Sequence, residues 1–207
     1  MLLLLGIGIF QFSNWERSEM GLTNKSPFQK KRPTPTTGTF TDSRDGQIYP
    51  WVRLKDGKKW MTQNLNYQMS DGLCYDNDHR NCSKFGRLYT WRIAKSVCPN
   101  GWRLPTDNDW REMTKQYGGS DIDADDGGQA SYAALINAGN SQFSAQLGGY
   151  RYSDEVFYDL DIRGYYWSST QRGASFAWYY RFNQYYEKLY RSTGSKSWAC
   201  SCRCLQD

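Results

Sequence analysis

Apolar and polar residues follow a helical period in the middle of the chain. Three apolar residues recur at the i, i+3 and i+7 spacing of one buried helix face: Trp110, Met113 and Tyr117. Thr106 precedes them and can cap the first amides of a helix, and Asp109 three residues later completes a capping-box spacing. Two glycines follow, as is common past a helix end. The pattern predicts a helix from Asp107 to about Tyr117.

Two other segments have helical character. Lys84 to Val97 carries apolar residues at mixed helical spacing and predicts a first helix, and the segment around Ser131 to Ala138 predicts a short third one. A hairpin is indicated where Gln47–Leu54 and Lys59–Gln63 flank an Asp-Gly turn signal.

The C-terminal third alternates with the period of two that is typical of strands. In the segment 176–182 this places Phe176, Trp178, Tyr180 and Phe182 on one side and Ala177, Tyr179 and Arg181 on the other. Tyr185 to Tyr190 is expected to return as the partner strand, and Trp198 to Leu205 to close the sheet. The sequence therefore predicts an α+β domain with two main helices and a loop-rich antiparallel sheet.

The N-terminal segment differs from the rest of the chain. Met1 to Phe10 is apolar and too short to span a bilayer. It resembles the apolar part of a secretory signal, although a basic start and a small-residue cleavage site are missing. A polar, basic stretch with a Pro/Thr-rich end follows, which favours an unpacked linker. We expect a signal or anchor at residues 1–12, a disordered linker at 13–38 and one folded domain at 39–207.

Composition narrows the function. The 207 residues carry a net charge of only +5, too dilute for a nucleic-acid surface, so no nucleic-acid partner is expected. Sixteen Tyr, nine Trp and nine Phe exceed what one core requires, which predicts that several rings reach the surface.

The six cysteines predict disulfides rather than a metal site. With one histidine and no Cys-x-x-Cys pair, zinc ligation is not expected. Cys74 and Cys82 bracket a short polar loop and suit a local disulfide in an oxidising compartment. Cys98 has two candidate partners near the C-terminus: Cys202 and Cys204. Either bridge would tie the first half of the domain to its end.

Neither a cofactor nor catalysis is expected. The acidic run Asp121, Asp123 and Asp125 has the rhythm of a calcium loop, but Asp126 and Tyr132 stand where an EF-hand needs Gly and Glu. It is a weak candidate cation site. His79, in the small cysteine loop, has no partner residues with which to form a catalytic group. The chain is therefore predicted not to be an enzyme.

Six ordered blocks of sequence resemble the Fibrobacter succinogenes major paralogous domain, a bacterial relative of the C-type lectin-like fold. The blocks begin at Thr39, Trp60, Gly86, Cys98, Gly148 and Tyr166, and a closing Arg203-Cys204 matches the end. The resemblance implies a C-type lectin-like fold, a disulfide between Cys98 and Cys204, and Cys202 in the apolar core. Cys200 would pair outside the domain or stay reduced. The family has no defined common activity. The related formylglycine-generating enzymes use cysteines, and Cys200-x-Cys202 could mimic such a pair. An enzyme of this type is therefore a less favoured hypothesis.

The segment from Trp167 resembles the variable region of proteins diversified by retroelements. The resemblance implies fixed positions at Trp167, Ala177, Trp178 and Phe182. It implies changeable, ligand-binding positions at Phe176, Tyr179, Arg181, Tyr185, Tyr186, Tyr190 and Arg191. Large apolar residues of the family blocks would place Trp178 and Phe182 in the core, and alternation would then turn Tyr179 and Arg181 outward. The alternative is an ordinary paralogue with an aromatic sheet.

Together these features predict an exported, non-catalytic module that recognises a protein or glycan at the cell surface or in secreted form. It would touch a membrane only through an uncleaved N-terminal anchor. The runner-up is a structural or adhesive surface protein, which would bury the same aromatic residues against a neighbouring copy.

Overall fold

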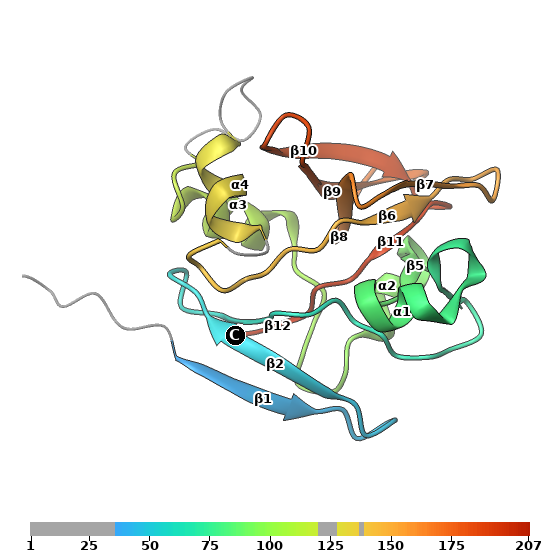
Figure 1. Ribbon diagram of the computed structural model, residues 1–207, viewed down its shortest axis with the longest axis horizontal. Coiled ribbons are helices and arrows are strands. Elements are labelled where there is room, and N and C mark those ends of the chain that lie inside the picture. The colour runs from blue at the N-terminus through green and yellow to red at the C-terminus, as the bar shows by residue number, and fades with distance from the viewer. Residues whose placement is uncertain (1–35, 120–127, 137–138) are drawn as a thin grey trace, which may run out of the picture. The chain divides into compact units, whose positions relative to one another are not determined.

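A computed structural model describes residues 36–119, 128–136 and 139–207 (Figure 1). The predicted signal or anchor at 1–12 and nearly all of the predicted linker at 13–38 lie outside the described residues. The linker boundary is slightly wrong, since Thr37 and Gly38 already belong to the first strand. Among the described residues, no helix is both long and apolar enough to cross a membrane.

The first sheet has four antiparallel strands. In spatial order they are β1 (Thr37–Thr41), β2 (Ile48–Arg53), β3 (Lys59–Met61) and β12 (Leu205–Gln206). The predicted hairpin is confirmed, because β2 and β3 pair across the Asp-Gly turn with Trp51 opposite Met61. Leu205 lies opposite Trp60. The end of the chain is therefore built into the N-terminal sheet.

The second sheet contains the C-terminal strands. In spatial order they are β10 (Lys188–Ser195), β9 (Phe176–Asn183), β8 (Arg163–Arg172), β6 (Gly148–Arg151), β11 (Ala199–Ser201), β5 (Leu88–Thr90) and β4 (Gly72–Leu73), with β7 (Phe157–Leu160) paired to β6. Most pairs are antiparallel, while β6–β8 and β8–β11 are parallel. The predicted pairing of 176–182 with a return strand is confirmed, but that strand, β10, begins at Lys188 and runs to Ser195, and residues 185–187 of the predicted 185–190 form the turn.

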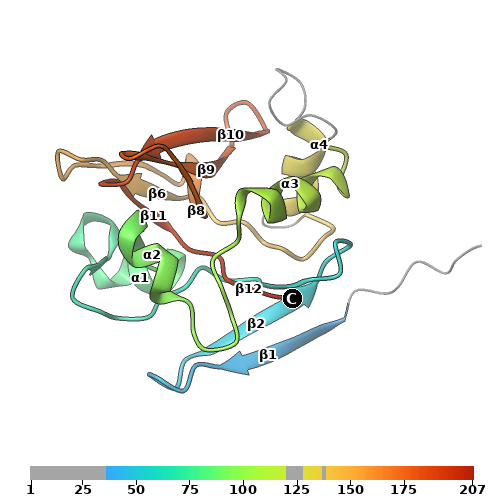
Figure 2. The same cartoon turned by 180° about the vertical axis from the view of Figure 1, so that it is seen from behind.

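The described part contains four α-helices and one short 3₁₀ helix. They are η1 (Tyr75–Asn77), α1 (His79–Phe85), α2 (Trp91–Val97), α3 (Asp107–Lys115) and α4 (Gln129–Leu135). Figures 1 and 2 show α3 and α4 beside one end of β10, and α1 and α2 near β5 and β11.

The prediction for α3 is confirmed in detail, with Thr106 and Asp109 bonded reciprocally as a capping box. α4 begins two residues before the predicted position and ends at Leu135. Ile136, predicted to be helical, is extended and bridges to Ala145, and the last two predicted residues, 137 and 138, lie outside the described part.

The single helix predicted over Lys84–Val97 is wrong. The segment contains the end of α1, the strand β5 and the whole of α2. Gly86 ends α1 at φ +76°, and a Cβ there would lie 2.7 Å from the Cβ of Asn64. Leu88–Thr90 then pairs with β11 instead of continuing a helix. The pairing strand comes from more than a hundred residues downstream, so local periodicity could not show it.

Apolar side chains cover both faces of β8 and β9. On the face toward α3 and α4, the rings of Trp110 and Tyr180 stack with centroids 4.8 Å apart. On the face toward α2, Trp167 donates its indole N–H to the carbonyl of Tyr89 and is fully buried. Such ring pairs add about 0.5–1.5 kcal/mol each beyond the burial of their area. The strands therefore lie between two cores.

Both implied disulfides are present. Cys74 bonds Cys82, and Cys98 bonds Cys204 with Cα atoms 5.9 Å apart. Cys200 and Cys202 are free thiols with no exposed surface, and burial raises the pKa of each. Cys202 thus occupies the apolar core as the resemblance implied, and Cys200 stays reduced.

Candidate binding surface

The seven predicted ligand-binding residues do not form one surface. In the β9–β10 register, Arg181 lies opposite Tyr190 and Tyr179 opposite Ser192, all on the face of the sheet toward α2. Phe176 and Arg191 lie on the other face. Tyr185 and Tyr186 belong to the turn between the two strands, where they are 78% and 54% exposed.

The prediction that Tyr179 faces outward is wrong. Its side chain is only 4% exposed and packs against the rings of Tyr165, Trp167 and Trp198, with centroids 5.5, 6.2 and 5.9 Å away. Alternation along β9 is real, but both of its sides meet apolar neighbours. Tyr179 is therefore a core residue.

The prediction that Trp178 is fully in the core is also wrong. This ring is half-buried, and two guanidinium groups lie over it: the Cζ of Arg191 is 3.4 Å from its centroid and the Cζ of Arg172 is 5.0 Å away. Phe182, by contrast, is fully buried as predicted.

Arg191, predicted to bind ligand, instead has a structural role. Its Nε donates to Oδ1 of Asp107 and its Nη2 to Oδ2, both at 2.7 Å. The hydroxyl of Tyr180 donates to the same carboxylate at 2.9 Å. Asp107 is the first residue of α3, where a negative charge is favoured by the helix dipole. Arg191 therefore fastens β10 to α3.

Tyr179→Ala is expected to lower the free energy of unfolding by about 3 kcal/mol or more, since it empties a site enclosed by three rings. Tyr185→Ala is the matched control and should change it by less than about 0.5 kcal/mol, because that ring is exposed. Urea unfolding followed by tryptophan fluorescence measures both. A wild-type midpoint for Tyr179→Ala would show that this side of β9 faces solvent.

Other rings join Arg181 and Tyr190 on the face toward α2. We name this surface the aromatic face and define it as Tyr150, Tyr152, Tyr158, Arg181, Tyr190 and Trp198, over a buried floor of Tyr165 and Tyr179. Tyr152 and Tyr158 are 39% and 40% exposed, while the two floor rings are 3% and 4% exposed. The surface thus offers partly open rings on a closed base.

Tyr150 is at the centre of the ring contacts. Its centroid lies 4.2 Å from that of Tyr165, 5.2 Å from that of Trp198 and 5.8 Å from that of Tyr158. Tyr152 also contacts Trp198, at 5.2 Å. Each exposed ring is held by others, so little rotamer freedom is left to lose on binding.

Backbone geometry explains how these rings meet. Tyr150 lies directly opposite Tyr158 in the β6–β7 register, and Tyr152 follows two residues later. Trp198 lies against β10 at Gly194, where a Cβ would come within 2.6 Å of the indole ring. The Tyr150-Arg151-Tyr152 alternation is a visible sequence signal that the prediction did not use. Nothing local links Trp198 to it.

Charged groups at the edge of the aromatic face are mostly paired. Asp159 accepts from the hydroxyl of Tyr165 at 2.6 Å and from Nη1 of Arg163 at 3.1 Å. Burial, and then this carboxylate, raise the pKa of Tyr165, and the same two causes raise the pKa of Tyr150 to about 12. These hydroxyls keep their protons at neutral pH and act as hydrogen-bonding groups rather than as bases.

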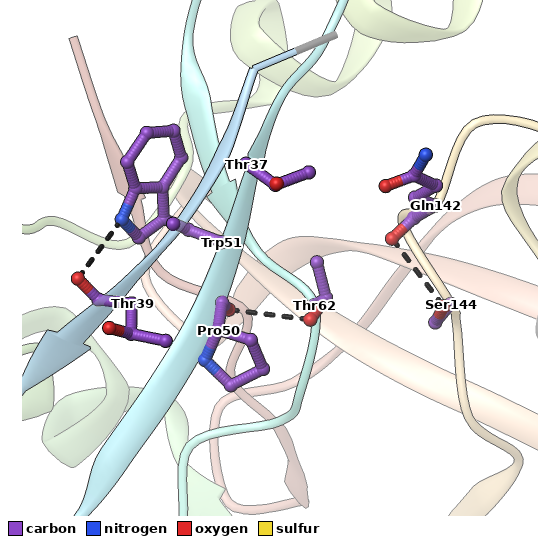
Figure 3. A pocket seen from close by; sticks show the side chains of 8 residues that line it. Thr37, Thr39, Pro50, Trp51, Thr62, Gln142 and Ser144 are labelled. Carbon is purple, nitrogen blue, oxygen red and sulfur yellow. Dashed lines mark hydrogen bonds between the residues drawn. The ribbon is translucent and has the colours of Figure 1, made fainter.

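A shallow hollow of about 480 Å³ lies elsewhere, between β1, β2 and the loop at 142–144 (Figure 3). Its lining is Thr37, Gly38, Thr39, Pro50, Trp51, Thr62, Gln142 and Ser144. Figure 3 shows Thr62 and Ser144 bonding to backbone carbonyls and the Trp51 indole bonding to that of Thr39. The lining has no titratable side chain, so it offers no general acid or base.

The candidate cation residues Asp121, Asp123 and Asp125 lie outside the described residues. Within 36–119, 128–136 and 139–207, no three His, Cys, Asp or Glu side chains gather as a metal site. His79 lies beside the small disulfide, with Nδ1 3.9 Å from Sγ of Cys74.

These features define a class: an α+β domain with two disulfides and two sheets, one of which presents an aromatic surface. The sequence profile of the Fibrobacter succinogenes major domain matches residues 49–206, and the chain belongs to this family. Comparison with curated proteins and with solved structures finds no match in either set.

Proposed function

We propose that the chain is an exported, non-catalytic recognition module that binds a protein partner through the aromatic face. The observation that carries this proposal is a connected set of rings whose outer members are about two-fifths exposed over a fully packed floor. Tyr and Trp give large contact area with few rotors to immobilise, and arginine adds forked hydrogen bonding.

A protein suits this surface better than a glycan. A stable protein interface needs about 800 Å² from each partner. The aromatic face spans β6, β7, β9 and β10, which gives it the necessary breadth. Exposed apolar side chains continue beside it: Ile162 is 49% exposed, and its carbonyl accepts from the amide of Gln184 at the adjacent turn that carries Tyr185 and Tyr186.

Export is supported by the two disulfides, which form and persist mainly in oxidising compartments. The non-catalytic part is supported by the thiols of Cys200 and Cys202. Burial raises the pKa of both, which disfavours the thiolate that catalysis or metal binding would need. A formylglycine-generating type of reaction is therefore the weaker proposal.

The C-type lectin-like assignment and retroelement diversification belong to this proposal as its finer parts. Diversification would be tolerated best at the positions outside the core clusters, namely Phe176, Arg181, Tyr185, Tyr186 and Tyr190. Tyr179 and Arg191 have structural partners that most other residues could not keep. Neighbouring genomic DNA with a reverse transcriptase and a near-copy of the coding segment would support it.

The test compares three immobilised proteins: wild type, a triple variant (Tyr152→Ser, Tyr158→Ser and Tyr190→Ser), and the control Ile48→Ser. Ile48 is 59% exposed on β2 and outside the aromatic face. Each is cross-linked to surface and secreted proteins of the source cells, and retained proteins are quantified by mass spectrometry. We expect at least one protein to be retained by wild type and control and reduced about tenfold on the triple variant, the loss expected from removing hot-spot rings.

Equal retention on all three proteins would contradict the proposal. Light scattering separates the adhesive alternative, which requires a dimer or larger assembly of wild type that the triple variant loses. Circular dichroism of the triple variant confirms that it remains folded.

A further inference from the structure

One cation on the aromatic face has no acidic partner among the described residues. Arg181 lies directly opposite Tyr165 on β8 and Tyr190 on β10, and its Cζ is 4.7 Å from the Tyr190 ring centroid. No carboxylate of the described residues lies within ion-pair distance of it. The covered Nε–H of Arg181 also has no hydrogen-bond acceptor in this part of the chain.

The neighbouring arginines are neutralised. Arg163 pairs with Asp159, Arg151 with Glu155, and Arg191 with Asp107 on the opposite face of the sheet. Among these arginines, Arg181 is therefore the one that forms no ion pair with a carboxylate of the described residues. A half-buried guanidinium without an anion is unfavourable for folding, because its desolvation is not compensated.

Stacking on Tyr190 orients the guanidinium without using its donors. A cation–π contact is made to the ring's π-electrons and occupies none of the five N–H donors, which lie in the plane of the guanidinium. The outer Nη groups can therefore donate two parallel hydrogen bonds to a carboxylate, the geometry in which Arg–carboxylate pairs are strongest. Apolar rings beside it lower the local dielectric and strengthen such a pair.

We propose that Arg181 binds the carboxylate of an Asp or Glu side chain of the protein partner, with an aromatic or aliphatic residue of the same segment packed on Tyr190 and the rings beside it. This inference rests on the proposed function and adds the chemistry of the ligand. The partner segment is acidic and apolar, and Arg181 determines that specificity.

The test uses a phage-displayed library of random seven-residue peptides, selected separately on wild type, Arg181→Gln, Arg172→Gln and the triple tyrosine variant. Arg172 is the matched control, since it also stacks on a ring, that of Trp178, but on the opposite face of the sheet. We expect wild type and Arg172→Gln to enrich peptides with Asp or Glu next to a large apolar residue, and Arg181→Gln to lose that enrichment.

A synthetic peptide from the selection then gives the affinity. Arg181→Gln should weaken binding about tenfold, and replacing the peptide's acid by its amide should weaken it equally and not additively. Raising NaCl from about 0.05 to about 0.5 M should weaken wild-type binding and leave the variant nearly unchanged.

The results distinguish failure of the carboxylate inference from failure of the proposed recognition function. Peptides without acids that need the tyrosines but not Arg181 would overturn the carboxylate inference and leave the recognition function in place. Peptides that bind the triple variant as well as wild type, or no selection at all, would overturn both. Uronic-acid or sulfated oligosaccharides that bind through Arg181 while no peptide does would overturn the protein partner.

Discussion

Arg203→Met is expected to lower the free energy of unfolding by about 4 kcal/mol or more. Arg203 has no exposed surface, and within the part of the chain that the structure describes it pairs with no carboxylate. Its guanidinium donates to Oδ1 of Asn64 twice and to three backbone carbonyls: those of Met61, Phe143 and Ser144. The faces of two rings, Phe143 and Tyr166, lie 4.6 and 5.5 Å from its Cζ.

The size of this effect follows from the acceptors that remain. Removing the guanidinium takes a donor from four oxygen atoms, three of them in buried hydrogen bonds, and each buried acceptor left unpaired costs about 1–3 kcal/mol. These oxygens belong to residues 61–64 at and after the end of β3 and to the loop at 142–144, so the change weakens the contact between two segments that are far apart in the sequence. Burial lowers the pKa of Arg203, because loss of solvent disfavours the charged guanidinium.

Urea unfolding followed by tryptophan fluorescence measures the change. Arg80→Met is the matched control, since Arg80 is 91% exposed and its pair with Asp78 lies on the surface, so the urea midpoint should stay close to that of wild type. Arg203→Lys tests geometry at constant charge and should still destabilise, because an ammonium lacks the planar fork. A wild-type midpoint for Arg203→Met would refute this account of the site.

Replacing both Cys98 and Cys204 by alanine is expected to cost about 4.7 kcal/mol in the chain-entropy account of disulfides, because the bond joins residues 106 positions apart. The same double replacement at Cys74 and Cys82, which are 8 positions apart, should cost only about 2.5 kcal/mol. Removing both thiols of a pair avoids exchange with the free Cys200 and Cys202.

Unfolding in urea without reductant compares the two double variants with wild type, and wild type with dithiothreitol provides an independent check. The prediction is that removing the Cys98–Cys204 disulfide costs more stability than removing the Cys74–Cys82 disulfide. A larger loss at Cys74–Cys82 would show that the link between the halves of the domain is already provided by β12 and Arg203, and that the long-range disulfide adds little.

Local signals in the sequence predicted local structure well. The capping box of Thr106 and Asp109 fixed the start of α3, because both partners lie within one helical turn. The Asp-Gly turn between β2 and β3 and the β9–β10 hairpin were found for the same reason: their strands are neighbours in the chain. Both disulfides came from cysteine spacing and from the resemblance to the family.

The candidate site was predicted less well, and β9 shows why. The alternation of residues along a strand predicts that Trp178 and Tyr179 point to opposite sides of the sheet. It does not predict which other residues cover each side. Tyr179 is buried because Tyr165 and Trp198 pack over it, whereas Trp178 is half-buried with the guanidinium groups of Arg172 and Arg191 over its ring. Of the predicted residues, Arg181 and Tyr190 lie on the aromatic face.

The sequence alone determined the family, the hairpins, the helix with its cap and the two disulfides, since these depend on contacts between near neighbours or on motifs retained in order. Only the tertiary structure decided which rings reach the surface. Tyr150, Tyr158 and Trp198 meet because β6, β7 and the approach to β11 come together in one sheet. Among the described residues Arg181 has no acidic partner, and the nearby Asp159 pairs with Arg163. Exposure and charge pairing are properties of what packs against a residue, and those neighbours come from distant parts of the chain.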